Sequence, residues 1–208
     1  MQVAVLTFEG FNELDSFVVA AIINRMRPKG WKAYITGPAE QVTSMNGVTV
    51  RTERRLDFVQ QADAVLVGSG MLTRDVVASP EFMAQLVLDP DRQLIGAQCS
   101  GTLVLSKLGL LNAVPACTDV TTKPWVVDSG VEVLEQPFFA RGNIATAGGC
   151  LSSQYLAFWV IARGAGLPAA QAALDYVAPV GEKRAYVTRA QAAVEPYLDT
   201  EMLVATIG

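Results

Sequence analysis

The sequence predicts an α/β protein with a mostly parallel sheet that is covered by helices on both faces. Short apolar segments of strand length alternate with segments of helical periodicity along most of the chain. The strand segments are apolar throughout, which is typical of strands buried on both faces of a sheet. With 208 residues and a hydrophobic content of 51%, the chain can bury one sizeable core, and we expect a single domain over residues 1–208.

The first half of the chain begins with a strand followed by a helix. The apolar segment 3–8 predicts the strand, and the helix predicted over residues 14–27 is ended by Pro28 and Gly30. Three further strands and one helix divided by Pro80 follow in this half, at residues 31–36, 47–51, 64–67 and 73–88.

The second half continues the same alternation. A buried strand at residues 93–97 leads directly into a helix at residues 100–108, which Gly109 ends. Three further strands and two helices are predicted, at residues 131–134, 138–141, 143–147, 152–163 and 168–177. Beyond Pro179 the pattern is weak and predicts no element.

The composition argues against a nucleic-acid or membrane partner. The net charge is -4 and no dense stripe of Lys and Arg is present to neutralise phosphates. The longest apolar runs, residues 17–23 and 155–162, are shorter than the roughly 20 residues that span a bilayer. Residues 1–6 lack the basic region and cleavage site of a secretory signal, which favours a cytoplasmic location.

The cysteines and the absence of histidine limit the chemistry further. Cys99, Cys117 and Cys150 lack the CxxC spacing of a structural zinc site, and a cytoplasmic protein is expected to have no structural disulfide. Since the chain has no histidine, every Cys-His or Ser-His catalytic arrangement within one chain is excluded. We expect no metal and no cofactor.

Several strand ends in the predicted sheet converge on one candidate pocket. In doubly wound sheets, ligands bind at the carboxyl ends of the strands. Here residues 8–12, 68–70 and 98–101 follow three predicted strands and are rich in small or polar residues. We therefore expect a small-molecule site where these three segments meet.

Cys99 is the predicted reactive centre of this pocket. It lies where a strand turns directly into a helix, in a segment with Gly96, Ser100 and Gly101, as a residue in a nucleophile elbow does. The N-terminus of the following helix is expected to favour the thiolate over the thiol. The simpler alternative is a buried, inert cysteine, which we consider less consistent with this position.

Two acids at the start of the first helix are candidate proton donors. Asp15 and Glu13 are two residues apart, so only one of them is expected to face the pocket, and periodicity alone does not choose between them. The facing carboxyl group would have a raised pKa beside a thiolate and could supply a proton, whereas helix capping is the alternative role.

Small residues around Cys99 are candidate hydrogen-bond donors. Gly68, Ser69 and Gly70 could offer backbone N–H groups to a developing negative charge, although a simple turn also explains them. Ser100 is a more plausible partner of the sulfur than Thr102. Cys117 and Cys150 have no comparable context and are interpreted as structural.

The segment from Ala97 to Leu105, followed by Gly109-Leu110-Leu111, resembles the nucleophile elbow of the ThiJ/PfpI superfamily, a branch of the class I glutamine amidotransferase-like fold. Segments 8–15, 67–70 and 145–149 are similar to other parts of that family, and the resemblance extends to about residue 180. It implies a flavodoxin-like three-layer sandwich and a homodimer.

The Leu14-Asp15 pair and Leu174-Asp175-Tyr176 are similar to the isocyanide hydratase branch of that superfamily. This resemblance favours Asp15 over Glu13. It implies that Cys99 attacks the carbon of an isocyanide, that Asp15 acts as general acid and base, and that water releases an N-substituted formamide. It also implies roles for Ser100 as hydrogen-bond partner of the sulfur and for Gly70 as backbone donor.

One departure from the family and two alternative functions accompany this hypothesis. Thr121-Thr122 is followed by Lys123-Pro124-Trp125, where family members often have histidine, which argues against the activities that use histidine. The alternatives are an oxidative-stress sensor, in which Cys99 is oxidised to a sulfenic or sulfinic acid, and a ligand-binding regulatory domain without turnover.

Overall fold

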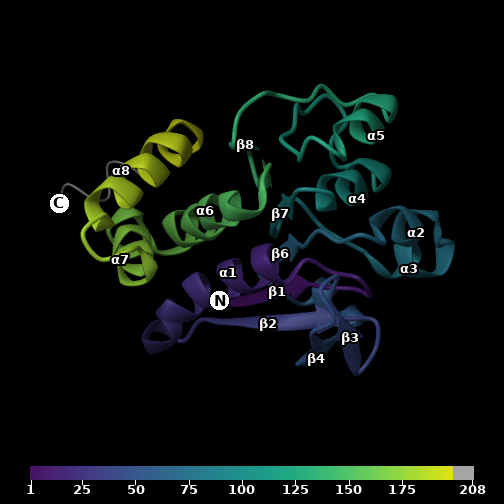
Figure 1. Ribbon diagram of the computed structural model, residues 1–208, viewed down its shortest axis with the longest axis horizontal. Coiled ribbons are helices and arrows are strands. Elements are labelled where there is room, and N and C mark those ends of the chain that lie inside the picture. Colours follow the sequence, from purple (N-terminus) through teal and green to yellow (C-terminus); the bar gives the residue numbers. More distant parts are fainter. Residues whose placement is uncertain (199–208) are drawn as a thin grey trace.

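In the computed structural model, which describes residues 1–198, the fold is built on one seven-stranded sheet (Figure 1). The strand order is β5-β2-β1-β6-β7-β9-β8, and every neighbouring pair is parallel except β8 with β9. In that order the strands are Arg54–Arg55, Lys32–Gly37, Gln2–Leu6, Ala64–Val67, Leu94–Gln98, Ile144–Ala147 and Phe138–Arg141. A separate antiparallel pair is formed by β3 (Gln41–Thr43) and β4 (Thr49–Arg51). The predicted mostly parallel sheet is confirmed.

Helices cover both faces of the sheet, which gives three layers. The helices on one face are α1 (Glu13–Ile23), α6 (Ser153–Ala165), α7 (Leu167–Val177) and α8 (Lys183–Val194). Those on the other are α2 (Thr73–Ala78), α3 (Pro80–Gln85), α4 (Gly101–Lys107) and α5 (Lys123–Asp128). Figure 1 shows α6 to α8 on one side of β6 and β7, and α2 to α5 on the other. Side chains of β1 alternate between the two cores, because successive residues of a strand point to opposite faces.

Short 3-10 helices complete the described part of the chain. They are η1 (Asn24–Lys29), η2 (Leu56–Gln60), η3 (Cys150–Ser152) and η4 (Glu195–Tyr197). The helix predicted over residues 14–27 is therefore α-helical only to Ile23 and continues as η1, which contains Pro28. Among the helices of residues 1–198, none is long and apolar enough to cross a membrane.

Two predictions about the second half are wrong. Residues 131–134 do not form a strand, since only Val133 makes an isolated bridge, to Ala116, and Val131 and Val133 pack against a core instead. Beyond Pro179 the chain forms α8, which was missed because only Ala190 and Val194 are fully buried along that helix. Such a narrow contact face gives little periodicity.

The register of the sheet brings the ends of its central strands to one edge. Val67 of β6 pairs with Ala97 of β7, and Gln98 pairs with Ala147 of β9. The residues that follow these strands therefore lie side by side, as expected for a parallel sheet. This edge is where the candidate site is found.

The turn from β7 into α4 holds Cys99 in a sterically strained conformation. Its φ of 47° lies in the left-handed region, which is uncommon for a residue with a side chain. The Cys99 N–H donates to the carbonyl of Ala147 at 2.8 Å, and the Thr118 hydroxyl donates to the carbonyl of Cys99 at 2.7 Å. These bonds fix the predicted nucleophile elbow.

Gly101 allows α4 to begin against the preceding strand, and its replacement by alanine is expected to destabilise the fold. A Cβ atom at Gly101 would lie 2.5 Å from the carbonyl oxygen of Val67. We expect Gly101→Ala to lower the free energy of unfolding by about 1–3 kcal/mol, the usual cost of overpacking. Urea denaturation measures this difference.

The matched control is Gly130→Ala, where φ is +86° but no atom lies within 4 Å of the added Cβ. This variant measures the cost of a left-handed backbone without a clash, about 1 kcal/mol, a cost that Gly101→Ala does not carry because the φ of Gly101 is not positive. A Gly101→Ala variant as stable as the wild type would show that the close approach at the elbow is not important.

Candidate active site

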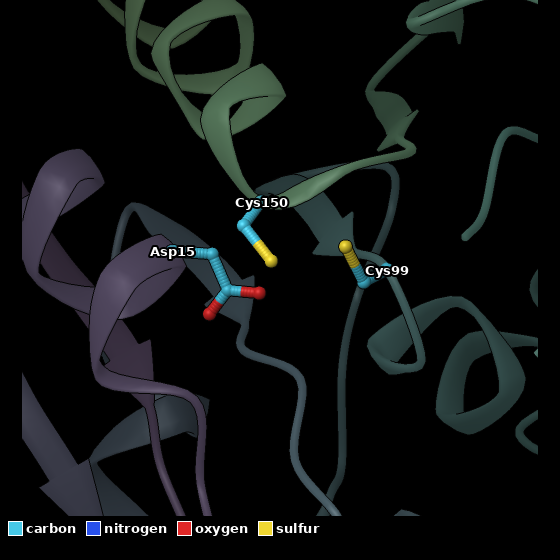
Figure 2. Close-up of side chains that lie close together, drawn as sticks. All are labelled: Asp15, Cys99 and Cys150. Carbon is cyan, nitrogen blue, oxygen red and sulfur yellow. The ribbon is translucent and has the colours of Figure 1, made fainter. Parts of the chain in front are cut away.

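Three side chains from distant parts of the sequence meet at this edge of the sheet. The reactive atoms of Asp15, Cys99 and Cys150 all lie within 4.8 Å of one another. Asp15 comes from the first turn of α1, Cys99 from the elbow after β7, and Cys150 from the start of η3. In Figure 2 the sulfur of Cys150 points into the space between the Asp15 carboxyl group and the Cys99 sulfur.

Asp15 is buried in a setting that favours its protonated form. The residue is only 1% exposed, and its Oδ2 accepts a hydrogen bond of 2.5 Å from the Ser69 hydroxyl. Its Oδ1 has no hydrogen-bond partner. Burial raises the pKa of Asp15 to about 7, against smaller opposing contributions from hydrogen bonds with Ser69 and Ser16. Near neutral pH this carboxyl group can therefore give or take a proton through Oδ1.

Glu13 lies in a different environment from Asp15. Hydrogen bonds from its own backbone and from Asn46 and Ser44 lower the pKa of Glu13, although burial opposes them. Two positions along a helix turn a side chain by more than a right angle, so the two acids point in different directions. The structure therefore places Asp15, and not Glu13, next to Cys99.

The burial of Cys99 favours its thiol form, whereas the helix N-terminus was expected to favour the thiolate. Burial raises the pKa of Cys99, and negative charge on Asp15 or Cys150 raises it further. A hydrogen bond from Gln98 Nε2, 3.4 Å from the sulfur, opposes this rise. Desolvation and the nearby acidic groups thus act against the stabilisation of the thiolate that the helix N-terminus was expected to provide.

Ser100 and Gly70 differ from their expected roles by bonding to each other. The Gly70 N–H donates to Ser100 Oγ at 3.1 Å, and Ser100 Oγ lies 2.7 Å from the Thr73 hydroxyl. The hydrogen bond to the Cys99 sulfur comes instead from Gln98. Because the Gly70 N–H already has an acceptor, it can serve a developing oxyanion only if Ser100 turns away.

Cys150 was not found from the sequence, and Asn12 and Gln98, which lie in segments expected to form the site, were given no individual role. Cys150, interpreted as structural, lies beside Cys99 and accepts a hydrogen bond from Asn12 Nδ2 at 3.1 Å. Gln98 links the two cysteine segments, since its Nε2 also donates to the carbonyl of Gly149 at 2.7 Å. The signal for Cys150 was its place after Gly148-Gly149 at another strand end.

Cys117 lies apart from this cluster. Its side chain is fully buried, and its backbone N–H donates to the Thr146 hydroxyl at 2.8 Å. Burial also raises the pKa of Cys117 to about 12, so its thiol is expected to be unreactive at neutral pH.

Asp15, Cys99 and Cys150 could in principle hold a metal ion. Two thiolates and a carboxylate suit Zn²⁺ with one position left open, and the three groups are close enough to bind one ion. All three must first lose a proton, however, and burial raises the pKa values of Asp15 and Cys99. Binding of a cation here would therefore have to displace protons from these groups.

Fold and site together define an α/β protein with a strained cysteine elbow and a buried acid beside the thiol. Residues 1–163 match the model of the DJ-1/PfpI family. The chain belongs to the DJ-1/PfpI family, which confirms the resemblance to ThiJ/PfpI proteins. No curated protein sequence matches the chain.

Solved structures of the same superfamily share this fold. A ThiJ/PfpI family protein from Pseudomonas syringae is 19% identical, with a TM-score of 0.74, over 93% of this chain and 90% of that one. A variant of a DJ-1 superfamily protein from Salmonella typhimurium is 23% identical, with a TM-score of 0.72, over 86% and 98%. Oxidised DJ-1 from Toxoplasma gondii is 21% identical, with a TM-score of 0.69, over 85% and 97%.

Proposed function

We propose that this protein is a cofactor-independent cysteine hydratase or hydrolase that acts on a small electrophile, most concretely an isocyanide. The observation that supports this most is the Asp15 carboxyl group, which has a pKa of about 7 and an unpartnered Oδ1, and one oxygen of which lies within 4.8 Å of the Cys99 sulfur. A nucleophile and a group able to carry its proton are thus adjacent, as covalent catalysis needs.

In the first step the Cys99 sulfur adds to the terminal carbon of the isocyanide. The Asp15 carboxylate takes the thiol proton while the S–C bond forms, and it then delivers this proton to the same carbon. The product is a neutral thioimidate, and Asp15 is a carboxylate again. This relay avoids a free thiolate, which burial disfavours here.

In the second step water adds to the thioimidate carbon. The Asp15 carboxylate accepts a proton from the attacking water, the C–S bond breaks, and protons go to the nitrogen and the sulfur. The N-substituted formamide leaves, and Cys99 and Asp15 return to their starting states. One isocyanide and one water give one formamide, so the cycle needs no cofactor.

The burial of Cys99 supports a small electrophile. The residue is only 4% exposed, so a bulky acyl group would not reach its sulfur without rearrangement. An isocyanide presents its reactive carbon at the end of a thin linear group, which suits a nucleophile with so little exposed surface.

The direct test is formamide production from a panel of alkyl and aryl isocyanides. Turnover by the wild type is the expected result. A panel without turnover would contradict isocyanide hydration. Ligand-induced stabilisation that persists without Cys99 would then favour a binding domain.

The pH dependence of this activity is expected to follow the Asp15–Cys99 pair. In the active form Cys99 is a thiol and Asp15 is a carboxylate, so the pair has lost one proton. Asp15, with a pKa of about 7, is the first of the two groups to lose its proton as pH rises. We expect kcat/KM to rise with pH around a midpoint of about 7. In Asp15→Asn the residual activity should rise only at much higher pH, since the pKa of Cys99 is raised by burial. An unchanged profile in that variant would contradict the assignment.

We also propose that the protein works as a homodimer in the cytoplasm. Leu14 and Phe17 on α1 and Leu151 beside Cys150 are exposed apolar residues near the site, which a second copy could cover. Sedimentation equilibrium is expected to give twice the mass of the chain. Leu151→Asp should weaken that association, and a monomeric wild type would contradict the proposal.

A further inference from the structure

The position of Cys150 suggests a second chemistry for the Cys99 thiol. The two sulfurs lie within 4.8 Å of each other, although 51 positions separate Cys99 and Cys150 in the sequence. Figure 2 shows both sulfurs directed into the same space beside the Asp15 carboxyl group. The hydration mechanism uses Cys99 and Asp15 but has no role for Cys150.

The surrounding amides stabilise negative charge on each sulfur. Asn12 Nδ2 donates to the Cys150 sulfur at 3.1 Å, and Gln98 Nε2 donates to the Cys99 sulfur at 3.4 Å. A thiol whose sulfur accepts an N–H hydrogen bond forms the nucleophilic thiolate more readily than a thiol packed only among apolar atoms. Both cysteines are therefore placed to react, and not merely to fill space.

A side-chain movement would be needed to bring the two sulfurs to bonding distance. A disulfide needs about 2.05 Å between sulfurs, so one side chain must move. Cys99 is fixed by hydrogen bonds from and to its backbone, whereas Cys150 is partly exposed and follows Gly148-Gly149 at the start of a short 3-10 helix. Rotation of the Cys150 side chain, with a small shift of η3, is the simplest way to close the gap.

We propose that Cys99 and Cys150 form a redox pair, in which Cys150 resolves a sulfenic acid on Cys99 to an intramolecular disulfide. The oxidant is a hydroperoxide. The Cys99 sulfur bonds to the terminal oxygen of the hydroperoxide as the O–O bond breaks, and the Cys99 thiol proton passes by way of the Asp15 carboxylate to the departing oxygen. This gives the sulfenic acid and an alcohol, or water when the oxidant is hydrogen peroxide.

The second step forms the S–S bond and releases water. The Asp15 carboxylate takes the Cys150 thiol proton, the Cys150 sulfur attacks the Cys99 sulfur, and the S–O bond breaks. The departing hydroxide takes the proton back from Asp15. Two thiols and one hydroperoxide thus give one disulfide, one water and one alcohol, and an external dithiol reverses the oxidation.

The pair would protect Cys99 from irreversible oxidation. A sulfenic acid without a nearby thiol is oxidised further to a sulfinic acid, whereas disulfide formation competes with that step. The proposal is independent of isocyanide hydration, because it is read from the mass of the protein and not from turnover.

The test is mass spectrometry of the fully reduced, full-length protein after graded exposure to hydrogen peroxide. The wild type is expected to lose the mass of two hydrogen atoms and to yield a crosslinked peptide that contains Cys99 and Cys150. Dithiothreitol should restore the original mass. Cys150→Ser should instead gain the mass of two oxygen atoms on Cys99, at a peroxide dose about tenfold lower than the wild type requires.

Cys117→Ala is the matched control, because it removes a buried cysteine outside the cluster and should leave the crosslink unchanged. The wild-type peptide map tests the proposal even if a variant fails to fold. A wild type in which Cys99 becomes a sulfinic acid without a crosslinked peptide would overturn the proposal. A crosslink only between two chains, detected as a covalent dimer, would also overturn it.

Discussion

Cys99→Ala is expected to lower the rate of formamide formation by about 10⁴-fold or more, because no other group can form the covalent intermediate. Within residues 1–198, Cys150 is the only other thiol close to Asp15, and it lies outside the strained elbow. The measurement is kcat/KM with the most reactive isocyanide of the panel, made at several pH values.

Cys117→Ala provides the control for the loss of a buried thiol, and it should retain wild-type activity. Far-UV circular dichroism should show that both variants are folded. Substantial turnover in Cys99→Ala would exclude Cys99 as the nucleophile. If Cys150→Ser then abolished the residual activity, Cys150 would have to carry it.

Asp15→Asn is expected to stabilise the protein at alkaline pH while it lowers activity by about 10²–10⁴-fold, the usual contribution of a general acid and base. The stability effect follows from the raised pKa. In the unfolded chain the Asp15 pKa returns to about 3.8, whereas in the folded protein it is about 7. Between these values the folded state binds more protons, so its stability falls as pH rises.

The size of this effect is set by the difference between the two pKa values. The contribution of Asp15 to the free energy of unfolding is fully present below pH 3.8 and is lost as pH rises through about 7. The total loss is up to about 4 kcal/mol. An asparagine stays neutral and can still accept the Ser69 hydrogen bond. The Asp15→Asn variant should therefore not lose this stability as pH rises. Urea denaturation at a series of pH values measures it.

Glu13→Gln is the matched control, because Glu13 lies on the same turn of α1 and has a lowered pKa. The stabilising contribution of Glu13 is present above its pKa in the unfolded chain and is lost as pH falls. Its effect on stability therefore depends on pH in the opposite direction to that of Asp15. Stability curves of the wild type and Asp15→Asn that run parallel from acid to alkaline pH would show that Asp15 is not held as a protonated acid.

Local patterns in the sequence were sufficient to predict the fold class. Continuously apolar strands indicate burial on both faces, and this property does not depend on which strands are neighbours. The elbow was equally local, since a strand, Cys99 and a helix follow one another within a few residues. The weakly patterned helix α8 was missed, because a helix with few buried residues leaves little signal.

Helical periodicity could not predict whether Asp15 or Glu13 faces Cys99, because this depends on how α1 packs against the sheet. Only the packed structure shows that Asp15 meets Ser69 and Cys99 while Glu13 meets Ser44 and Asn46. The protonation state of Cys99 also depended on packing, since desolvation is a property of the whole surroundings and not of one helix terminus.

The sequence by itself determined that this chain forms a mostly parallel α/β sheet with Cys99 at a strand-to-helix elbow, because both properties come from the order of neighbouring residues. The tertiary structure alone decided which groups surround that cysteine. Gln98 is the neighbour of Cys99 in the sequence, but Asp15 and Cys150 follow other strands, β1 and β9, and only the register of β1, β6, β7 and β9 brings them beside Cys99. Side chains that are distant in sequence can share a proton or a bond only after the sheet has assembled.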